Sequence, residues 1–334
     1  MNKKVNPRIV TVGGGTGTFV VLSGLKDYPL NLSSIVTMMD SGGSTGRLRD
    51  QLGVLPPGDL RQALVALSDS KEIWRKLFTY RFESGDLKGH NFGNIFISAL
   101  EKITGSTAEA INLATEILQT KGNVYPVTLS NCTLCAGYAD GSVVEGESNI
   151  EEIVKEGNKI TRMYLTPSAV MNLEAKKELE NADFIIFGPG DLYTSIIPNL
   201  LVEGMPEVLA YSRAKKIFIL NVMTRYGQTD GFKSTDFIFE LERYLGGISL
   251  DYIFINETRP SQEVLDWYRE VDKAHFVEDT TFGGYFDNRK ILRGDFLSKN
   301  RVVQAANDHV KRSLIRHDPD KIAEAIYKLV DREF

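Results

Sequence analysis

The chain has 334 residues, of which 42% are hydrophobic and 25% are charged. This composition is typical of a globular protein and excludes a disordered or fibrous chain. Lys and Arg number 39 against 44 Asp and Glu, a net charge of −5 with no block of like charge, so neither nucleic acid nor an anionic membrane is expected as a partner. With two cysteines, no secretory signal and no apolar run of about 18 residues, we expect a cytoplasmic protein without membrane insertion.

The amino-terminal part of the chain predicts a β-α-β unit. Arg8–Val12 is a short β-branched run, and Thr18–Leu25 carries apolar side chains at helical spacing. Ile35–Met39 is expected to be the next buried strand. Asp59 and Ser106 each precede a capping-box partner by three residues, which predicts that they are the N-cap residues of two helices.

Three further apolar runs are typical of strands covered on both faces of a parallel sheet, namely Phe184–Phe187, Ile217–Leu220 and Tyr252–Ile255. Residues 122–165 instead show an alternating pattern typical of antiparallel strands. The Asp140-Gly141 dipeptide within them favours a type I′ hairpin turn, so this region is predicted to be an antiparallel insertion. Pro319–Val330 is predicted to be a helix. We therefore expect one α/β domain over residues 1–334, with a doubly wound, mostly parallel sheet and an inserted antiparallel hairpin region.

The first predicted strand is followed by a glycine-rich turn. Four of its five residues are glycine: Gly13, Gly14, Gly15 and Gly17, with Thr16 among them. Such a run lets backbone N–H groups and the positive end of a helix approach an anion, and phosphate suits that geometry. The dinucleotide fingerprint is incomplete, because its third glycine would fall on Thr18. The alternative is a tight turn that only needs a positive φ.

The second predicted strand also ends in a loop that could bind a ligand. Asp40 closes this strand, where it could bind a ribose hydroxyl, hold Mg²⁺ or cap the next turn. The next four residues can form a second nest of N–H donors, and Arg47 supplies a forked cation suited to phosphate. The four residues are Ser41, Gly42, Gly43 and Ser44.

Further polar residues follow other predicted elements. Gly188, Gly190 and Asp191 come after one apolar strand, and Asn221 comes after the next. Because the carboxyl ends of parallel strands meet at one edge of a sheet, we expect these loops to converge on a single pocket. Asn94 could contact a base edge or a sugar hydroxyl, although Asn94 or Asn91 could instead cap the adjacent helix. Asn221 could likewise be an ordinary turn residue.

Cys132 and Cys135 form a C-x-x-C pair. Without a second pair or a nearby histidine, a zinc site is not expected, and the two residues are interpreted as small core side chains. The sequence contains no serine-hydrolase, zinc-protease or P-loop motif, so no catalytic residue is assigned.

Six motifs, in order, resemble those of the CofD-like family, in particular its YvcK branch, also called the gluconeogenesis factors. The resemblance extends from Arg8 to Asp318. The motifs are Gly14-Gly-Thr-Gly17, Met39-Asp-Ser-Gly-Gly-Ser-Thr-Gly-Arg-Leu-Arg49, Leu55-Pro-Pro-Gly-Asp-Leu-Arg61, Gly89-His-Asn-Phe-Gly-Asn94, Phe187-Gly-Pro-Gly-Asp-Leu-Tyr-Thr-Ser195 and Arg316-His-Asp318.

This resemblance implies a Rossmann-like fold and a regulatory protein that binds a nucleotide-sugar, with UDP-N-acetylglucosamine as the leading ligand. Such proteins are linked to cell shape and cell-wall precursor control during gluconeogenic growth. The implied site places the pyrophosphate on Gly13–Gly17 and Ser41–Ser44. Its pocket would be lined by Asp40, Asn94, Asp191, Asn221 and Arg316. No cofactor is required, although NAD could occupy the site. A cell-wall synthesis protein and a second copy of the chain are the expected protein partners.

The CofD branch itself consists of Mg²⁺-dependent transferases that join a phospholactyl group to a deazaflavin precursor. Its paired carboxylates are missing here, where the sequence reads Met39-Asp-Ser-Gly-Gly43, and this departure favours binding over transfer. The alternative is a transferase of phosphorus-containing groups with Asp40, Asp59 and Asp191 as Mg²⁺ ligands. Pro319 stands where some relatives carry a phosphorylatable threonine, so phosphorylation is not expected at this position.

Overall fold

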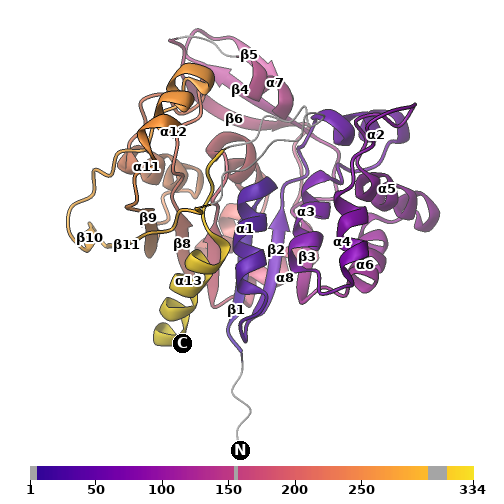
Figure 1. Ribbon diagram of the computed structural model, residues 1–334, viewed down its shortest axis with the longest axis horizontal. Coiled ribbons are helices and arrows are strands. Elements are labelled where there is room, and N and C mark those ends of the chain that lie inside the picture. Colours follow the sequence, from indigo (N-terminus) through magenta and orange to yellow (C-terminus); the bar gives the residue numbers. More distant parts are fainter. Residues whose placement is uncertain (1–5, 154–156, 300–313) are drawn as a thin grey trace, which may run out of the picture.

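The computed structural model describes residues 6–153, 157–299 and 314–334. Its strands form an eight-stranded sheet in the order β10-β11-β9-β8-β7-β1-β2-β3 and a three-stranded sheet in the order β5-β4-β6 (Figure 1). The strands of the large sheet are β1 (Arg8–Gly13), β2 (Asn31–Val36), β3 (Gly122–Pro126), β7 (Phe184–Phe187), β8 (Lys215–Ile219), β9 (Tyr252–Asn256), β10 (Tyr285–Phe286) and β11 (Arg289–Gly294). Those of the small sheet are β4 (Thr133–Tyr138), β5 (Val143–Glu145) and β6 (Ile160–Thr166).

The large sheet is parallel except for β10, which pairs antiparallel with β11. β1 pairs with both β2 and β7, so the chain runs outward through β2 and β3 on one side and through β7, β8 and β9 on the other. The predicted α/β fold with a mostly parallel sheet is confirmed. Ligand crevices form at the point where the strand order reverses in this way. In this sheet, that point lies between β1 and β7.

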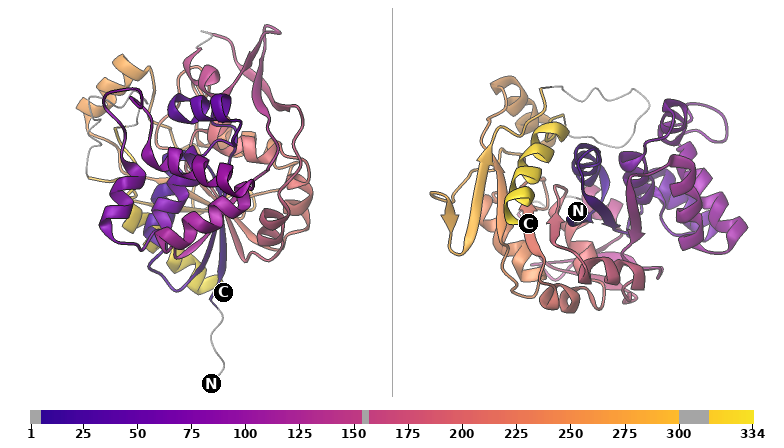
Figure 2. Two further views of the ribbon diagram at one scale, coloured as in Figure 1. Left: turned by 90° about the vertical axis from the view of Figure 1, so that its right-hand side faces the viewer. Right: turned by 90° about the horizontal axis from the view of Figure 1, so that it is seen from below.

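Helices cover both faces of this sheet. Figure 2 shows, in the view from below, α1 and α13 on one side and the helices coloured pink to salmon on the other. The helices are α1 (Gly15–Leu25), α2 (Gly43–Leu52), α3 (Gly58–Leu67), α4 (Glu72–Thr79), α5 (Phe92–Thr104), α6 (Thr107–Leu118), α7 (Glu147–Glu152), α8 (Leu173–Glu180), α9 (Ile197–Leu200), α10 (Met205–Tyr211), α11 (Ser234–Tyr244), α12 (Gln262–Trp267) and α13 (Pro319–Glu333), with π-helical turns η1 (Leu192–Ile196) and η2 (Tyr268–Asp272). No described helix is long and apolar enough to cross a bilayer.

The central strands are buried on both faces, as their continuous apolar sequences predict. Phe187, Phe218 and Phe254 of neighbouring strands are at most 1% exposed. The strand expected at Ile35–Met39 is displaced, because β2 runs from Asn31 to Val36. The sequence obscured its start, since Ser33 and Ser34 are polar yet buried, and Ser34 accepts a 2.9 Å hydrogen bond from the Thr11 hydroxyl.

The antiparallel region also differs from its prediction. Residues 122–126 form β3, which pairs parallel with β2 in the large sheet, so the antiparallel strands begin only at Thr133. The turn at Asp140-Gly141 is not type I′, which needs a positive φ at both central residues. Gly141 has φ +83°, whereas Asp140 is not among the described residues with positive φ. Asp140 Oδ1 instead accepts the N–H and hydroxyl of Ser142 and braces a longer loop.

Several local predictions are confirmed. Ser106 caps α6 by accepting the N–H of Glu109, and Asn91 caps α5 by accepting that of Asn94. Asp318 caps α13, which begins at Pro319 as expected. Cys132 and Cys135 are free, buried core residues, and burial raises the pKa of both thiols.

Candidate functional site

Three loops meet at the carboxyl edge of the sheet, where the sequence predicted them. They follow β1, β2 and β7, and β1 lies between the other two strands. A Cβ on Gly17 would collide with the Pro189 carbonyl, and one on Gly190 would lie 3.8 Å from the Gly14 oxygen. The side-chain amide of Asn221 donates a 2.8 Å hydrogen bond to the Gly190 carbonyl. The loops after β1, β7 and β8 are therefore in direct contact.

Asp59 does not cap α3, contrary to the prediction. The helix begins at Gly58 with Pro57 at its N-cap, and no side chain caps it. The Asp59 side chain reaches the glycine turn instead, where Oδ1 accepts the N–H of Gly15 at 2.8 Å. Gly15 has φ +62°, and a Cβ on Gly14 would collide with Asp59 Oδ2. A protein carboxylate thus occupies part of the anion-binding position that the sequence assigned to phosphate.

Asp40 lies in the adjacent loop and is also tied to the backbone. Its Oδ1 accepts the N–H of Gly42 at 2.9 Å, and a Cβ on Gly58 would collide with its Oδ2. Burial raises the pKa of Asp40, while hydrogen bonds from Gly42 and Thr45 and the charge of Arg61 act against that rise. One N–H of the predicted nest at 41–44 is consequently already satisfied by a carboxylate.

Two carboxylates that sequence reasoning missed come from α7 in the antiparallel region. The Ser41 N–H donates to Glu147 Oε2 at 3.4 Å, and the Ser148 N–H donates to the Ser41 hydroxyl at 3.0 Å. Glu151 Oε1 accepts the hydroxyl of Thr194 in η1 at 3.0 Å. The short helix α7 therefore joins the loops after β2 and β7.

These side chains interact electrostatically. Burial, together with the charge of Asp40, raises the pKa of Asp59 to about 7 and raises that of Glu147 well above its usual value. Burial and the charge of Asp191 raise the pKa of Glu151 to about 7. Near pH 7 a fraction of these groups therefore carries a proton.

Arg225, also missed, is a cation at this edge. It follows β8, and its NH2 lies 3.3 Å from Glu151 Oε2 while its Nε lies 4.0 Å from Asp191 Oδ2. The charge of Asp191 is the largest influence that raises the pKa of Arg225. We call the group of Asp40, Asp59, Glu147, Glu151, Asp191 and Arg225 the strand-end cluster.

Other predicted residues make structural contacts. The Ser44 hydroxyl lies 3.2 Å from His90 Nδ1 and accepts the Asn91 N–H. The side-chain oxygen Oδ1 of Asn94 accepts a hydrogen bond from Arg61 Nε at 2.7 Å, and its side-chain amide donates to the Thr45 hydroxyl. Asn91 therefore connects the start of α5 to α2, and Asn94 connects α5 to both α2 and α3. Their contacts with a ligand stay predictions.

Two arginines, Arg47 and Arg316, were also expected at the site. Arg47 is exposed, and its NH2 donates to the Lys88 carbonyl at 3.1 Å. Arg316 lies just before α13, where its carbonyl accepts the N–H of Ser298. The approach of the Arg316 guanidinium to the glycine turn stays a prediction.

The alternative Mg²⁺ ligands Asp40, Asp59 and Asp191 do not form a ready metal site. Across residues 6–153, 157–299 and 314–334, no group of three His, Cys, Asp or Glu side chains is arranged to hold a metal ion. Mg²⁺ is, however, often bound by one or two carboxylates together with substrate phosphates and water. Asp40 and Asp59 remain chemically suited to that role because both are carboxylates and the charge of Asp40 raises the pKa of Asp59.

The missed residues gave weak signals in the sequence. Glu147 and Glu151 lie on a short polar helix, a pattern typical of a solvent-exposed surface. Arg225 stands four residues after Asn221, which was recognised. Arg225 follows the end of β8 by six residues and Glu147 follows the end of β5 by two, so charged residues close to a strand end were the available signal for both.

Comparison with known proteins agrees with this architecture. Residues 9–294 match the family described as "2-phospho-L-lactate transferase CofD". A protein of Thermotoga maritima is 41% identical over 323 residues, covering 96% of this chain and 99% of its own. A Bacillus subtilis protein is 38% identical over 327 residues, covering 97% and 98%. Both carry names that describe a gluconeogenesis factor.

The fold has a solved counterpart. The crystal structure of a UPF0052 family member from Bacillus halodurans superposes with a TM-score of 0.86 at 35% identity. It covers 96% of this chain and 99% of its own.

Proposed function

This chain belongs to the CofD family. We propose that it is a regulatory protein whose strand-end cluster binds a nucleotide-sugar of the UDP-N-acetylglucosamine type. The observation that carries the proposal is the contact between the loops after β1, β2 and β7 at the reversal of strand order. Such a crevice is where nucleotides bind in open α/β sheets.

The charge of the cluster sets a condition on this ligand. The cluster contains five carboxylates, and Arg225 contacts two of them, Glu151 and Asp191. A diphosphate would meet repulsion unless carboxylates are protonated, Arg225 turns to the ligand, or a divalent cation accompanies it. The raised pKa values of Asp59 and Glu151 make protonation accessible near pH 7.

Titration calorimetry with UDP-N-acetylglucosamine tests the proposal. The wild-type protein should bind it saturably, and Arg225→Ala should weaken binding about tenfold, because a charge-assisted contact to phosphate contributes about 1.5 to 3 kcal/mol. Arg213→Ala is the matched control, since Arg213 is exposed at the opposite end of β8. Absence of heat at millimolar ligand, with and without Mg²⁺, would overturn the assignment.

A specific observation supports a second candidate, a Mg²⁺-dependent transferase of phosphorus-containing groups. The matching family carries a transferase description, and the charge of Asp40 raises the pKa of Asp59, whose carboxylate accepts the Gly15 N–H of the glycine turn. In this candidate the two carboxylates would hold the cation, which would neutralise phosphate charge when bound. Incubation with Mg²⁺ and nucleoside diphosphate donors, followed by mass spectrometry, should then reveal turnover that Asp40→Asn removes. Saturable binding without turnover favours the regulatory protein.

We also propose that ligand binding regulates contact with a cell-wall synthesis protein during gluconeogenic growth and that the chain forms a homo-oligomer. The names of relatives as gluconeogenesis factors support the link to gluconeogenic growth. Light scattering measures the oligomeric state. Pull-down with the wild-type protein and the Arg225→Ala variant, in the presence and absence of the sugar nucleotide, measures binding of the partner. A monomeric protein, together with partner binding that does not change when the ligand is added, would contradict this proposal.

A further inference from the structure

A second cleft lies beyond the carboxyl end of β9, outside the strand-end cluster. Its volume is about 390 Å³. Its walls come from the loop after β9, from α12 with η2, and from the segment that follows η2. The lining residues used below are Arg259, Leu265, Arg269, His275, Phe276 and Asp279.

The floor of the cleft is fixed to the end of β8. The His275 N–H donates to the Thr224 hydroxyl at 2.8 Å, and the Thr224 N–H donates to the His275 carbonyl at 2.8 Å. Met223 and Phe276 form an antiparallel bridge. These contacts give the cleft a defined shape before any ligand arrives.

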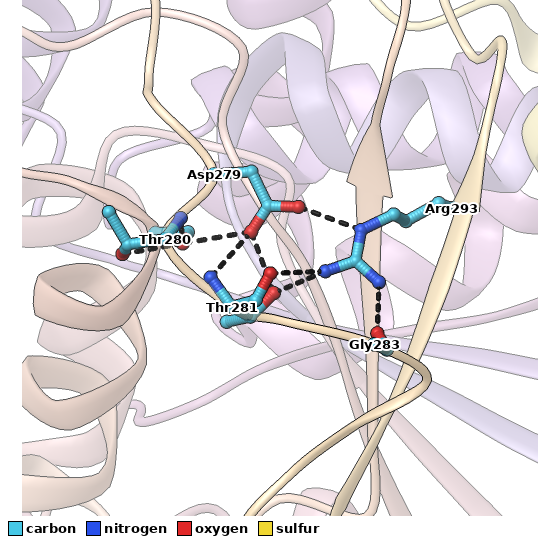
Figure 3. Close-up of polar contacts among 6 residues, drawn as sticks. Asp279, Thr280, Thr281, Gly283 and Arg293 are labelled. Atoms are coloured by element: carbon cyan, nitrogen blue, oxygen red, sulfur yellow. Dashed lines mark hydrogen bonds and ion pairs between the residues drawn. The ribbon is translucent and has the colours of Figure 1, made fainter.

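Each acidic residue of the lining has a cationic partner within the protein. Figure 3 shows Asp279 facing Arg293, whose Nε donates to Oδ2 at 2.8 Å. The same guanidinium donates to the Thr281 carbonyl and hydroxyl and to the Gly283 carbonyl. The neighbouring Glu278 pairs with Lys233 at 3.0 Å. Within the lining, the charge of Asp279 is therefore held by Arg293, whereas Glu278 forms only an exposed ion pair.

The cationic residues are, in contrast, weakly engaged. Arg259 lies 5.8 Å from the centre of the Phe276 ring, and within the described part of the chain no carboxylate forms an ion pair with it. Arg269 pairs with Asp266 at 3.4 Å, and both side chains are largely exposed. Exposed pairs of this kind contribute little free energy and exchange readily. Two guanidinium groups are thus available at one cleft.

We propose that this cleft binds the phosphate group of a small organic phosphate of mononucleotide size, at a site separate from the strand-end cluster. Guanidinium groups match the oxygens of phosphate through paired hydrogen bonds. A cleft of this volume is within the range of small-molecule sites, about 300 to 1,000 Å³. Leu265 and the Phe276 ring supply the apolar wall that a nucleoside needs.

Tryptophan fluorescence offers a local readout. The chain has two tryptophans, Trp74 on α4 and Trp267 on α12. In a Trp74→Phe background, titration with UMP, AMP and inorganic phosphate should change Trp267 emission saturably, with calorimetry on the wild-type protein as an independent measure. Arg259→Gln and Arg269→Gln should each weaken binding about tenfold or more. Arg213→Gln, an exposed arginine remote from the cleft, should leave it unchanged.

Two outcomes would overturn the proposal. The first is the absence of saturable binding of all three probes at millimolar concentration. The second is binding that survives both cleft substitutions or that disappears in Arg225→Ala, because the phosphate would then be bound at the strand-end cluster. Retained binding in Arg225→Ala, together with loss in Arg259→Gln, supports the separate site even if the nucleotide-sugar does not bind at the cluster.

Discussion

The N–H of Gly15 donates a 2.8 Å hydrogen bond to the carboxylate of Asp59, 44 residues further along the chain. The positive end of α1 and its first free N–H therefore face a side chain of the protein itself. Any anionic ligand of the glycine turn has to share this position with Asp59. The protonation state of this one buried carboxyl should therefore affect stability and, if the proposed ligand binds at the glycine turn, its affinity as well.

Stability should decrease as the pH rises toward neutrality because of Asp59. Its pKa is about 7 in the folded protein, against an ordinary value of about 3.9. Between these values the folded protein keeps a proton that the unfolded chain has lost, so the unfolding free energy falls with rising pH. Asp59→Asn should remove about 2 kcal/mol of the decrease between pH 5 and pH 7.5, measured by urea denaturation.

The matched control for this measurement is Asp331→Asn, because Asp331 is exposed on α13. It should leave the pH dependence unchanged. If Asp59→Asn shows the wild-type slope, Asp59 does not hold the raised pKa.

Ligand affinity should follow the same titration. If a sugar nucleotide binds without a divalent cation, its affinity should be about a hundredfold higher at pH 6 than at pH 8, since Asp59 and Glu151, each with a pKa of about 7, must both be neutral beside the diphosphate. Calorimetry in buffers of different ionisation heat also measures the proton uptake. Addition of Mg²⁺ should flatten the profile. Equal affinity at both pH values without Mg²⁺ contradicts the proposed position of the diphosphate.

Gly17 should be sensitive to substitution because of packing rather than ligand binding. A Cβ at this position would collide with the Pro189 carbonyl of the loop after β7. Gly17→Ala should lower the unfolding free energy by about 1 to 3 kcal/mol, as overpacking does elsewhere. Gly284→Ala is the control, because a Cβ there would meet no atom within 4 Å. Equal denaturation midpoints for the two variants would show that the loops can separate freely.

Asn91 should contribute to stability as a helix cap. Its side chain accepts the N–H of Asn94 at the start of α5, so Asn91→Ala should lower the unfolding free energy by about 1 kcal/mol. Asn112→Ala, an exposed substitution within α6, should change it far less. A thermal melt of both variants compares them directly, and similar melting temperatures would argue against a capping role.

The sequence determined the features that depend on neighbouring residues. The apolar runs predicted β1, β7, β8 and β9 because strands inside a parallel sheet are buried on both faces. Ser106 was predicted to be a helix cap because its capping partner, Glu109, lies only three residues away in the sequence. The glycine turn after β1 and the loop after β7 were placed at one edge, since parallel strands end at the same side of a sheet.

Only the tertiary structure decided the chemistry of that edge. Asp59 fits a capping pattern in its own segment, yet its carboxylate bonds to Gly15 on another helix. Glu151 and Arg225 belong to distant segments that meet through a 3.3 Å contact. Their shifted pKa values arise from burial and from each other's charge, and both depend on long-range packing that no local pattern encodes.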